Sequence, residues 1–163
     1  MKNYQGVARR FTIYRTAKKV TVVDDFAHNP AKIAAVVKAA RGLAERIIAI
    51  YQPHGFGPTR FLKNDYVATF RQILHDHDAL YLLPIYYAGG TANKNISSED
   101  IIRELGSIPF AALAIADRNA LLARLSNTVK QGDCVLLMGA RDPSLASFAK
   151  SIVELFGGAE EGC

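Results

Sequence analysis

The sequence has little cysteine and no long apolar run. Its two cysteines are Cys134, inside an apolar segment, and Cys163, the last residue, so we expect no disulfide framework and favour a reducing compartment. Apolar stretches such as Phe110 to Ala116 are much shorter than the roughly 20 residues that a membrane-spanning helix needs. No apolar signal core follows Met1. We therefore expect a cytoplasmic protein with no membrane partner.

The sequence also lacks the motifs of several enzyme and binding classes. It contains no G-x-x-x-x-G-K-[ST] phosphate loop, no G-x-G-x-x-G fingerprint and no G-x-S-x-G elbow. Lys and Arg number 20 against 15 Asp and Glu, which gives a net charge of +5. No zinc-finger, helix-turn-helix or RNP pattern surrounds the basic residues, so we expect no nucleic-acid partner. A nucleotide or phosphorylated metabolite accounts for the same charge, because phosphate needs only a few cations.

Two histidines and two aspartates, residues 75–78, have the composition of a metal site but not its placement. They follow a predicted helix and precede a predicted strand. Histidine is favourable near a helix C-terminus and aspartate is common in turns. No metal site is predicted there.

The length of 163 residues is typical of one domain that can bury its own core. We predict a single domain over residues 1–156 and a flexible tail over residues 157–163. Short β-branched runs alternate with segments of helical periodicity, which is typical of an α/β fold. The predicted strands are residues 11–15, 20–24, 46–51, 79–85, 110–115 and 134–138. The predicted helices are residues 30–41, 61–74, a short one after a capping box at residues 97–100, 118–130 and 144–156.

The short connection between the first two strands predicts an antiparallel hairpin. Each later strand is followed by a helix, which predicts a Rossmann-like, open, mostly parallel sheet with helices on both faces. Sites in such sheets lie beyond the carboxyl ends of the strands. The candidate loops are therefore residues 24–30, 52–58, 86–95 and 139–143.

The first of these loops contains two adjacent carboxylates, Asp24 and Asp25, followed by His28 and the start of a helix at Pro30. Such a group is able to hold a ribose, a metal-bound phosphate or an ammonium group. Alternatively, these side chains only satisfy backbone donors of the turn.

The second loop places the polar side chains of His54, Thr59 and Arg60 around two glycines and two prolines. These side chains are suited to an anionic ligand. Alternatively, His54 is a turn residue and Arg60 an exposed residue of the next helix.

Four motifs, in this order over about residues 5 to 105, resemble the C-terminal domain of the Mur ligases. The motifs are Gly6-Val7-Ala8-Arg9-Arg10-Phe11, Asp24-Asp25-Phe26-Ala27-His28-Asn29-Pro30, Gln52-Pro53-His54 through Thr59-Arg60, and Pro84-Ile85-Tyr86-Tyr87-Ala88-Gly89-Gly90 with Ser97-Ser98-Glu99-Asp100. Within this family the chain is most similar to the ligases that add L-alanine to UDP-N-acetylmuramate. It is also similar to the recycling ligases that add L-alanyl-gamma-D-glutamyl-meso-diaminopimelate.

The resemblance implies the last third of a bacterial three-domain enzyme, whose UDP-binding and central ATPase domains are absent from this chain. ATP and Mg²⁺ would be bound mainly by the central domain. The parent enzyme would activate UDP-N-acetylmuramate as an acyl phosphate and join it to the amine of an amino acid or peptide, in peptidoglycan synthesis or recycling. The isolated domain would be inactive and would hold no catalytic residue of its own.

The resemblance also implies roles for single residues. Arg10 would reach the nucleotide phosphates and Asp25 the ATP ribose. Phe26 and His28 would face the incoming amine, and His54 with Arg60 would line the loop that binds the acceptor.

Several positions depart from the L-alanine-adding pattern. These enzymes tend to have tyrosine at Phe26, a second histidine at Asn29, and arginines at Gly55 and Pro58. Phe26 resembles the recycling ligases, whereas His54 in its Gln-Pro-His string resembles the L-alanine enzymes. The acceptor is therefore open between L-alanine and a tripeptide.

Two alternatives carry different functions. One is a stand-alone, non-catalytic module that binds a nucleotide or peptide at the same strand ends. The other is the ligase domain of a folylpolyglutamate synthetase, to which the Asp-x-Ala-His-Asn-Pro string alone is also similar.

Overall fold

The structure, a computed structural model, describes residues 9–160 of the chain. The first three residues of the Gly6-to-Phe11 motif lie outside the described residues. Within residues 9–160 the chain forms one six-stranded sheet and five helices. The strands are β1 (Thr12–Arg15), β2 (Thr21–Asp25), β3 (Ile47–Gln52), β4 (Ala79–Leu82), β5 (Ala111–Ala114) and β6 (Cys134–Gly139). The helices are α1 (Pro30–Arg41), α2 (Phe56–Ile73), α3 (Ser98–Leu105), α4 (Arg118–Thr128) and α5 (Leu145–Leu155).

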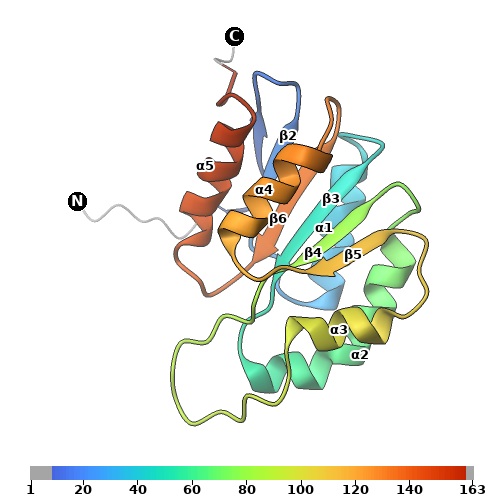
Figure 1. Cartoon of the computed structure of the whole chain (residues 1–163), viewed down its shortest axis with the longest axis vertical. Helices are drawn as coiled ribbons and strands as arrows, with labels where there is room; N and C mark the ends of the chain where they lie inside the picture. The colour runs from blue at the N-terminus through green and yellow to red at the C-terminus, as the bar shows by residue number, and fades with distance from the viewer. Residues whose placement is uncertain (1–8, 161–163) are drawn as a thin grey trace.

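The sheet has the strand order β1-β2-β6-β3-β4-β5. β1 pairs with β2 antiparallel, and all other neighbours are parallel. One face packs against α1, α2 and α3, and the other packs against α4 and α5. Figure 1 shows α4 and α5 in front of the sheet and α1 behind it. The predicted hairpin and the mostly parallel sheet with helices on both faces are confirmed.

The central strands explain why the sequence folds this way. Every residue of β3 and β6 is buried, as expected for strands covered on both faces, and their sequences are nearly continuous apolar runs. Cys134 lies in the first position of β6, where burial raises the pKa of its thiol to about 12. Among residues 9–160, no helix is long and apolar enough to cross a membrane.

The predicted start of the second helix was wrong. We expected a loop through Pro58 and a helix from Phe61, whereas α2 begins at Phe56. Gly55 has a φ of 74°, which allows the sharp entry into the helix. Pro58 lies in the first turn, where its missing N–H removes no helical hydrogen bond. The hydroxyl of Thr59 donates to Gly55 O at 2.6 Å and closes this turn.

The capping box that begins α3 is confirmed. Ser97 N donates to the Asp100 carboxylate at 2.8 Å, and the Ser97 side chain bonds the same aspartate. These bonds satisfy donors at the helix start, where the acidic side chain also complements the helix dipole. The loop after β4 therefore enters α3 at a defined position.

The predicted tail begins with a paired segment. Ala17 N donates to Gly158 O at 3.0 Å, Glu160 N donates to Arg15 O at 2.6 Å, and the Glu160 carboxylate pairs with Lys19. Residues 157–160 thus lie against the β1–β2 hairpin, and residues 161–163 lie outside the described part of the chain. Whether this segment moves in solution stays a prediction.

Four residues that resemble metal ligands, 75–78, serve a different purpose in the fold. The Asp78 carboxylate accepts hydrogen bonds from Arg41 Nη2 at 2.6 Å and from Ile47 N at 2.8 Å. Burial alone would raise the pKa of Asp78, but hydrogen bonds from Arg41, His75 and Ile47 lower it. This ion pair fastens α1 to the turn before β4, at the edge opposite to the carboxyl ends of the strands.

At the carboxyl ends of the strands, the connections leave toward different faces of the sheet on either side of β6. The helices that follow β2 and β3 cross one face, whereas α5, which follows β6, crosses the other. The chain therefore diverges on both sides of β6, which is where open α/β sheets bind ligands. In the parallel register Asp25 pairs with Met138 and Gln52 pairs with Gly139. The loops that follow these three strands consequently leave the sheet side by side.

Candidate functional site

Asp25 organises the loop that follows β2. One carboxylate oxygen accepts from Phe11 N at 2.7 Å and the other accepts from Ala27 N at 2.8 Å. An ionised carboxylate accepts about four hydrogen bonds, so each oxygen retains a free lone pair. Asp25 thus satisfies backbone donors of the turn, as the alternative interpretation of the sequence expects. Its carboxylate is still able to accept a hydrogen bond from a ligand hydroxyl.

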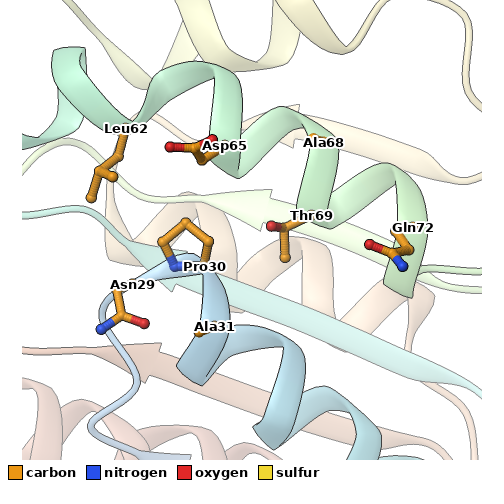
Figure 2. A pocket seen from close by; sticks show the side chains of 8 residues that line it. All are labelled: Asn29, Pro30, Ala31, Leu62, Asp65, Ala68, Thr69 and Gln72. Atoms are coloured by element: carbon orange, nitrogen blue, oxygen red, sulfur yellow. The ribbon is translucent and has the colours of Figure 1, made fainter.

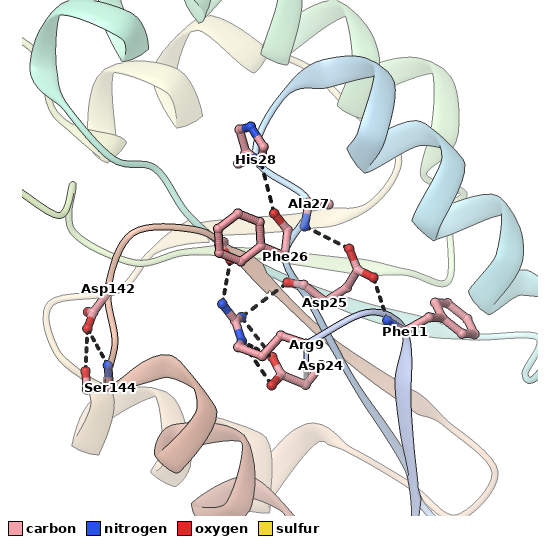
Figure 3. A network of polar contacts seen from close by, with 10 residues as sticks. Arg9, Phe11, Asp24, Asp25, Phe26, Ala27, His28, Asp142 and Ser144 are labelled. Atoms are coloured by element: carbon pink, nitrogen blue, oxygen red, sulfur yellow. Dashed lines mark hydrogen bonds and ion pairs between the residues drawn. The ribbon is translucent and has the colours of Figure 1, made fainter. Parts of the chain in front are cut away.

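Arg9 links three segments of the chain by hydrogen bonds at the carboxyl ends of the strands (Figure 3). Its guanidinium donates to both carboxylate oxygens of Asp24, at 2.8 to 3.0 Å, and to Gly139 O at 2.8 Å. The Asp24 side chain is only 2% exposed. Burial raises the pKa of Asp24, and the hydrogen bonds and charge of Arg9 act in the opposite direction. Arg9 therefore joins the start of the domain, β2 and the turn after β6.

His28 and His54 come from different loops and lie together at the site. Their ring centroids are 5.9 Å apart. Phe26, which is 46% exposed, meets the edge of the His28 ring at 5.6 Å. His28 Nδ1 lies 3.1 Å from Phe26 O, and with the proton on Nδ1 this contact leaves Nε2 as an acceptor. The structure thus brings together three of the residues that the sequence assigns to the acceptor.

A pair of buried tyrosines holds the backbone of this histidine loop. The hydroxyls of Tyr51 in β3 and Tyr66 in α2 are hydrogen-bonded at 2.8 Å, and both lie within hydrogen-bond distance of His28 O, at 3.3 and 3.2 Å. One phenol donates to the other, and the second donates to His28 O. Burial raises the pKa of both phenols. Both therefore stay protonated at neutral pH and keep the His28 carbonyl in place.

His54 carries a perturbed imidazole. Its Nδ1 is buried and has no hydrogen-bond partner among residues 9–160. Burial lowers the pKa of His54, and the neighbouring charges of His28 and Arg141 lower it further. The ring is consequently neutral at pH 7 and offers one nitrogen as an acceptor.

This shift predicts a pH dependence of stability. Because the folded-state pKa of His54 lies below its ordinary value of 6.5, protonation favours the unfolded chain. The stabilising effect of the neutral ring is complete above pH 6.5 and is lost as pH falls through the lowered folded-state pKa. We expect His54→Gln to reduce the loss of melting temperature between pH 7.5 and 5.5, as measured by circular dichroism.

The matched control for this experiment is His77→Gln. The His77 side chain is 80% exposed, so its removal should leave the pH dependence of the wild-type chain unchanged. Equal pH profiles for the His54 variant and the wild type would contradict the prediction.

Arg60 lies apart from the two histidines. Its guanidinium donates to Asn93 O at 3.3 Å and to the Asn95 side chain. Among the described residues Arg60 makes no hydrogen bond to His28 or His54. The structure therefore shows Arg60 as a support of the loop between β4 and α3. Whether Arg60 also contacts the acceptor stays a prediction. Its guanidinium was free to reach either side of α2, and only the fold decides which.

The turn after β6 is built on two residues with positive φ, Gly139 at 154° and Arg141 at 69°. Asp142 accepts from Arg118 Nη2 at 2.8 Å and from the Ser144 hydroxyl at 2.6 Å. Burial alone would raise the pKa of Asp142, but bonds from Ser144, the charge of Arg118 and a bond from Gln52 lower it. Asp142 is thus paired with Arg118, and the Arg141 side chain remains exposed at the edge.

A cavity of about 670 Å³ lies between this turn and the loop that follows β4. Phe56 and Tyr87 form one wall with ring centroids 5.2 Å apart, and Lys94 Nζ lies 4.7 Å over the Tyr87 ring. Gln52 lines the cavity, is 7% exposed, and has an amide oxygen without a hydrogen-bond partner among the described residues. The cavity therefore combines an aromatic wall, charged groups and an unsatisfied acceptor.

A second hollow of about 520 Å³ lies between the start of α1 and one side of α2 (Figure 2). Pro30 and Ala31 border it on one side, and Asp65 and Thr69 on the other. Asn29 stands at its rim and accepts from Lys32 N at 2.9 Å, which caps α1. The hollow contains no cluster of titratable groups within the described part of the chain.

Several residues of the site escaped the sequence analysis. Arg10, chosen from the Arg-Arg pair, is exposed, whereas Arg9 forms the buried contacts. The sequence contained one sign of the tyrosine pair, because Tyr51 follows four aliphatic residues in a buried strand. Gln52 lies in one of the four motifs and Arg141 in a candidate loop, but the proximity of their strands is set by the pairing of β3 with β6, which are far apart in the sequence.

Residues 9–141 match the protein family described as Mur ligase, glutamate ligase domain. The UDP-N-acetylmuramate–L-alanine ligase of Anaeromyxobacter dehalogenans is 37% identical over 157 residues, which cover 90% of this chain and 31% of that protein. The chain therefore spans less than a third of the length of this curated relative.

Solved structures share the fold. A UDP-N-acetylmuramate-alanine ligase from Thermotoga maritima has a TM-score of 0.60 at 24% identity, covering 90% of this chain and 29% of that one. A murein peptide ligase from Psychrobacter arcticus has a TM-score of 0.69 at 17% identity, covering 94% and 31%. The fold of this chain is thus that of a known domain type.

Proposed function

The chain belongs to the Mur ligase glutamate ligase domain family, and from this premise we propose that it is the substrate-closing domain of an ATP-dependent amide ligase. The ligase joins an amino acid or peptide to UDP-N-acetylmuramate in peptidoglycan synthesis or recycling. The observation that carries the proposal is the meeting of His28 and His54 at 5.9 Å beside the Asp25 loop, at the open carboxyl edge of the sheet. The relative that acts on UDP-N-acetylmuramate and L-alanine supports the same chemistry.

The nucleotide side of the site is assigned to Asp25 and Arg10. The free lone pairs of Asp25 suit ribose hydroxyls, and the exposed Arg10 guanidinium suits phosphate oxygens. These residues fit ATP, which together with Mg²⁺ supplies the phosphoryl group that activates the muramoyl carboxylate. Both would be held mainly by a central domain that carries a phosphate loop.

The acceptor side is assigned to Phe26, His28 and His54. The amine nitrogen attacks the carbonyl carbon of the acyl phosphate, the carbon–oxygen bond to phosphate breaks, and the nitrogen loses a proton as the amide forms. The neutral His54 ring offers a nitrogen that is suited to accept a hydrogen bond from the amine. Arg60 contributes indirectly, because it supports the loop next to the aromatic wall.

Closure of this domain onto its partners would exclude water from the acyl phosphate and complete the site. The work of the chain is therefore positioning and charge complementarity, and not bond breaking by a nucleophile of its own. We therefore expect the isolated domain to be inactive.

The test starts from the coding sequence that precedes Met1, searched for an in-frame G-x-x-x-x-G-K-[ST] domain. We expect the longer protein to release phosphate from ATP only when UDP-N-acetylmuramate and an amine acceptor are both present, and the 163-residue chain to release none. Asp25→Asn in the longer protein should raise the KM for ATP about tenfold, since one hydrogen bond to a charged group contributes roughly 1.5–3 kcal/mol. The KM for the acceptor should stay within about twofold.

Three outcomes would contradict the proposal. Phosphate release by the isolated chain would show that it needs no phosphate loop from elsewhere. A reading frame that truly begins at Met1 would instead favour a stand-alone module that binds a nucleotide or peptide. A folylpolyglutamate-type activity would appear as turnover with folate and glutamate in place of the UDP-sugar.

A further inference from the structure

Two buried tyrosines carry hydroxyl groups that ring packing does not require. Tyr51 is 0% exposed and Tyr66 is 3% exposed, and their ring centroids lie 5.3 Å apart beside Phe70. Phenylalanine would fill the same space, because it differs from tyrosine only by the hydroxyl group. A buried hydroxyl costs free energy unless it forms a hydrogen bond. The two hydroxyls therefore need a use besides packing.

Both hydroxyls meet at one backbone carbonyl. Tyr51 Oη lies 3.3 Å and Tyr66 Oη lies 3.2 Å from His28 O, and the two phenol oxygens are 2.8 Å apart. Each phenol has one O–H to donate, so one hydroxyl bonds His28 O while it accepts from the other. Burial raises the pKa of both phenols, so neither loses its proton near neutral pH. His28 O thus has two alternative donors.

The two tyrosines come from the elements that border the loop of His54. Tyr51 lies in β3, which ends just before this loop, and Tyr66 lies in α2, which follows it. His28 belongs to a different loop, between β2 and α1. The hydrogen bonds to His28 O therefore join the His28 loop to the elements on both sides of the His54 loop.

The hydrogen bonds of the neighbouring residues fix the His28 loop only locally. Ala27 N donates to the Asp25 carboxylate at 2.8 Å, and His28 Nδ1 lies 3.1 Å from Phe26 O. The His28 and His54 rings are 5.9 Å apart between centroids and share no hydrogen bond among the described residues. Within residues 9–160, the hydrogen bonds from this loop to β3 and α2 are those of the tyrosine pair.

We propose that Tyr51 and Tyr66 are positioning residues of the ligase, which hold the His28 ring against the His54 ring through the His28 carbonyl, and that either phenol alone is enough. The proposal rests on the proposed function, which assigns the two histidines to the amine acceptor. The tyrosines act through His28 and not by contact with a substrate. Removal of one hydroxyl leaves the other free to donate to His28 O. Removal of both leaves this carbonyl without a donor from β3 or α2.

The test compares Tyr51→Phe, Tyr66→Phe and the double variant of the 163-residue chain by NMR at pH 8.5. The contact of His28 Nδ1 with Phe26 O favours the neutral tautomer that carries its proton on Nδ1, and imidazole ¹⁵N shifts distinguish the two tautomers. The wild type and both single variants should keep this tautomer and a nuclear Overhauser contact between the two histidine rings. The double variant should lose this contact and populate the Nε2–H tautomer, because the freed backbone no longer holds the ring in place.

The matched control is Tyr81→Phe. It removes a phenol from a side chain that is 2% exposed and packs on the opposite face of the sheet, so both NMR signals should stay as in the wild type. A cooperative thermal melt by circular dichroism checks that each variant is folded, which we expect because the phenylalanine rings keep the packing. Retention of both signals in the double variant, or their loss in either single variant, would overturn the proposal.

Kinetics of the longer protein separate this inference from the proposed function. The double variant should raise the KM for the amine acceptor about tenfold, because a misplaced group loses the productive geometry, and leave the KM for ATP within about twofold. Each single variant should stay within about twofold of the wild type for both substrates. Turnover by the double variant with an unchanged acceptor KM would defeat the positioning role alone. Loss of the histidine contact in the double variant, with no phosphate release by the longer wild-type protein, would defeat the ligase function alone.

Discussion

Arg9→Met should lower the free energy of unfolding by about 3–5 kcal/mol, the cost of breaking a buried ion pair. The Asp24 carboxylate is 2% exposed and receives three guanidinium contacts of 2.8 to 3.0 Å. Without Arg9 it remains buried with its main donor gone. The lost bond to Gly139 O adds to this cost. Urea unfolding at pH 7 followed by circular dichroism measures the change as a lower midpoint.

The double variant Arg9→Met/Asp24→Asn is the most informative comparison with the single variant Arg9→Met. It removes the stranded charge, so it should recover a substantial part of the stability lost in the single variant. The matched control is Arg124→Met, at an exposed position of α4, with an expected change within about 0.5 kcal/mol. A loss below about 1 kcal/mol for Arg9→Met, or no recovery in the double variant, would show that the pair is as weak as an exposed one.

The fold was predictable because its signals are local. The runs that form β3 and β6 are apolar throughout, and the capping box at Ser97 marks its helix by short-range chemistry. The start of α2 was missed because Gly55 and Pro58 favour a turn as well as a first helical turn. In the folded chain the Thr59 side chain is buried and its hydroxyl donates to Gly55 O, which favours the earlier helix start.

The candidate site was predictable in part for the same reason. Strand ends can be located in sequence, so the meeting of the His28 and His54 loops followed from the α/β pattern. Side-chain directions cannot be located this way. The long side chain of Arg60 turned toward Asn95, and the buried member of the Arg-Arg pair is the first one. Gln52 and Arg141 became neighbours only through the pairing of strands that are widely separated in the chain.

Gly139→Ala tests the turn after β6, with an expected loss of about 2–4 kcal/mol of stability. A Cβ at Gly139 would lie 2.9 Å from Leu145 Cδ1 and 3.2 Å from Gln52 O, and the φ of 154° disfavours any side chain. Steric overlap and backbone strain therefore both lower the stability of Gly139→Ala. Urea unfolding under the conditions used for Arg9 measures the sum.

The chain offers controls that separate these two causes. Gly132 has a φ of 92° with no atom within 4 Å of an added Cβ, so Gly132→Ala carries the strain without the overlap and should cost about 1–2 kcal/mol. Gly57→Ala introduces neither backbone strain nor steric overlap, so it should leave the stability almost unchanged. Equal losses of stability in Gly139→Ala and Gly132→Ala would show that the turn after β6 shifts to accommodate the added Cβ. A larger loss at Gly139 means that Gln52, Leu145 and the hydrogen bond from Arg9 to Gly139 O together fix the turn after β6.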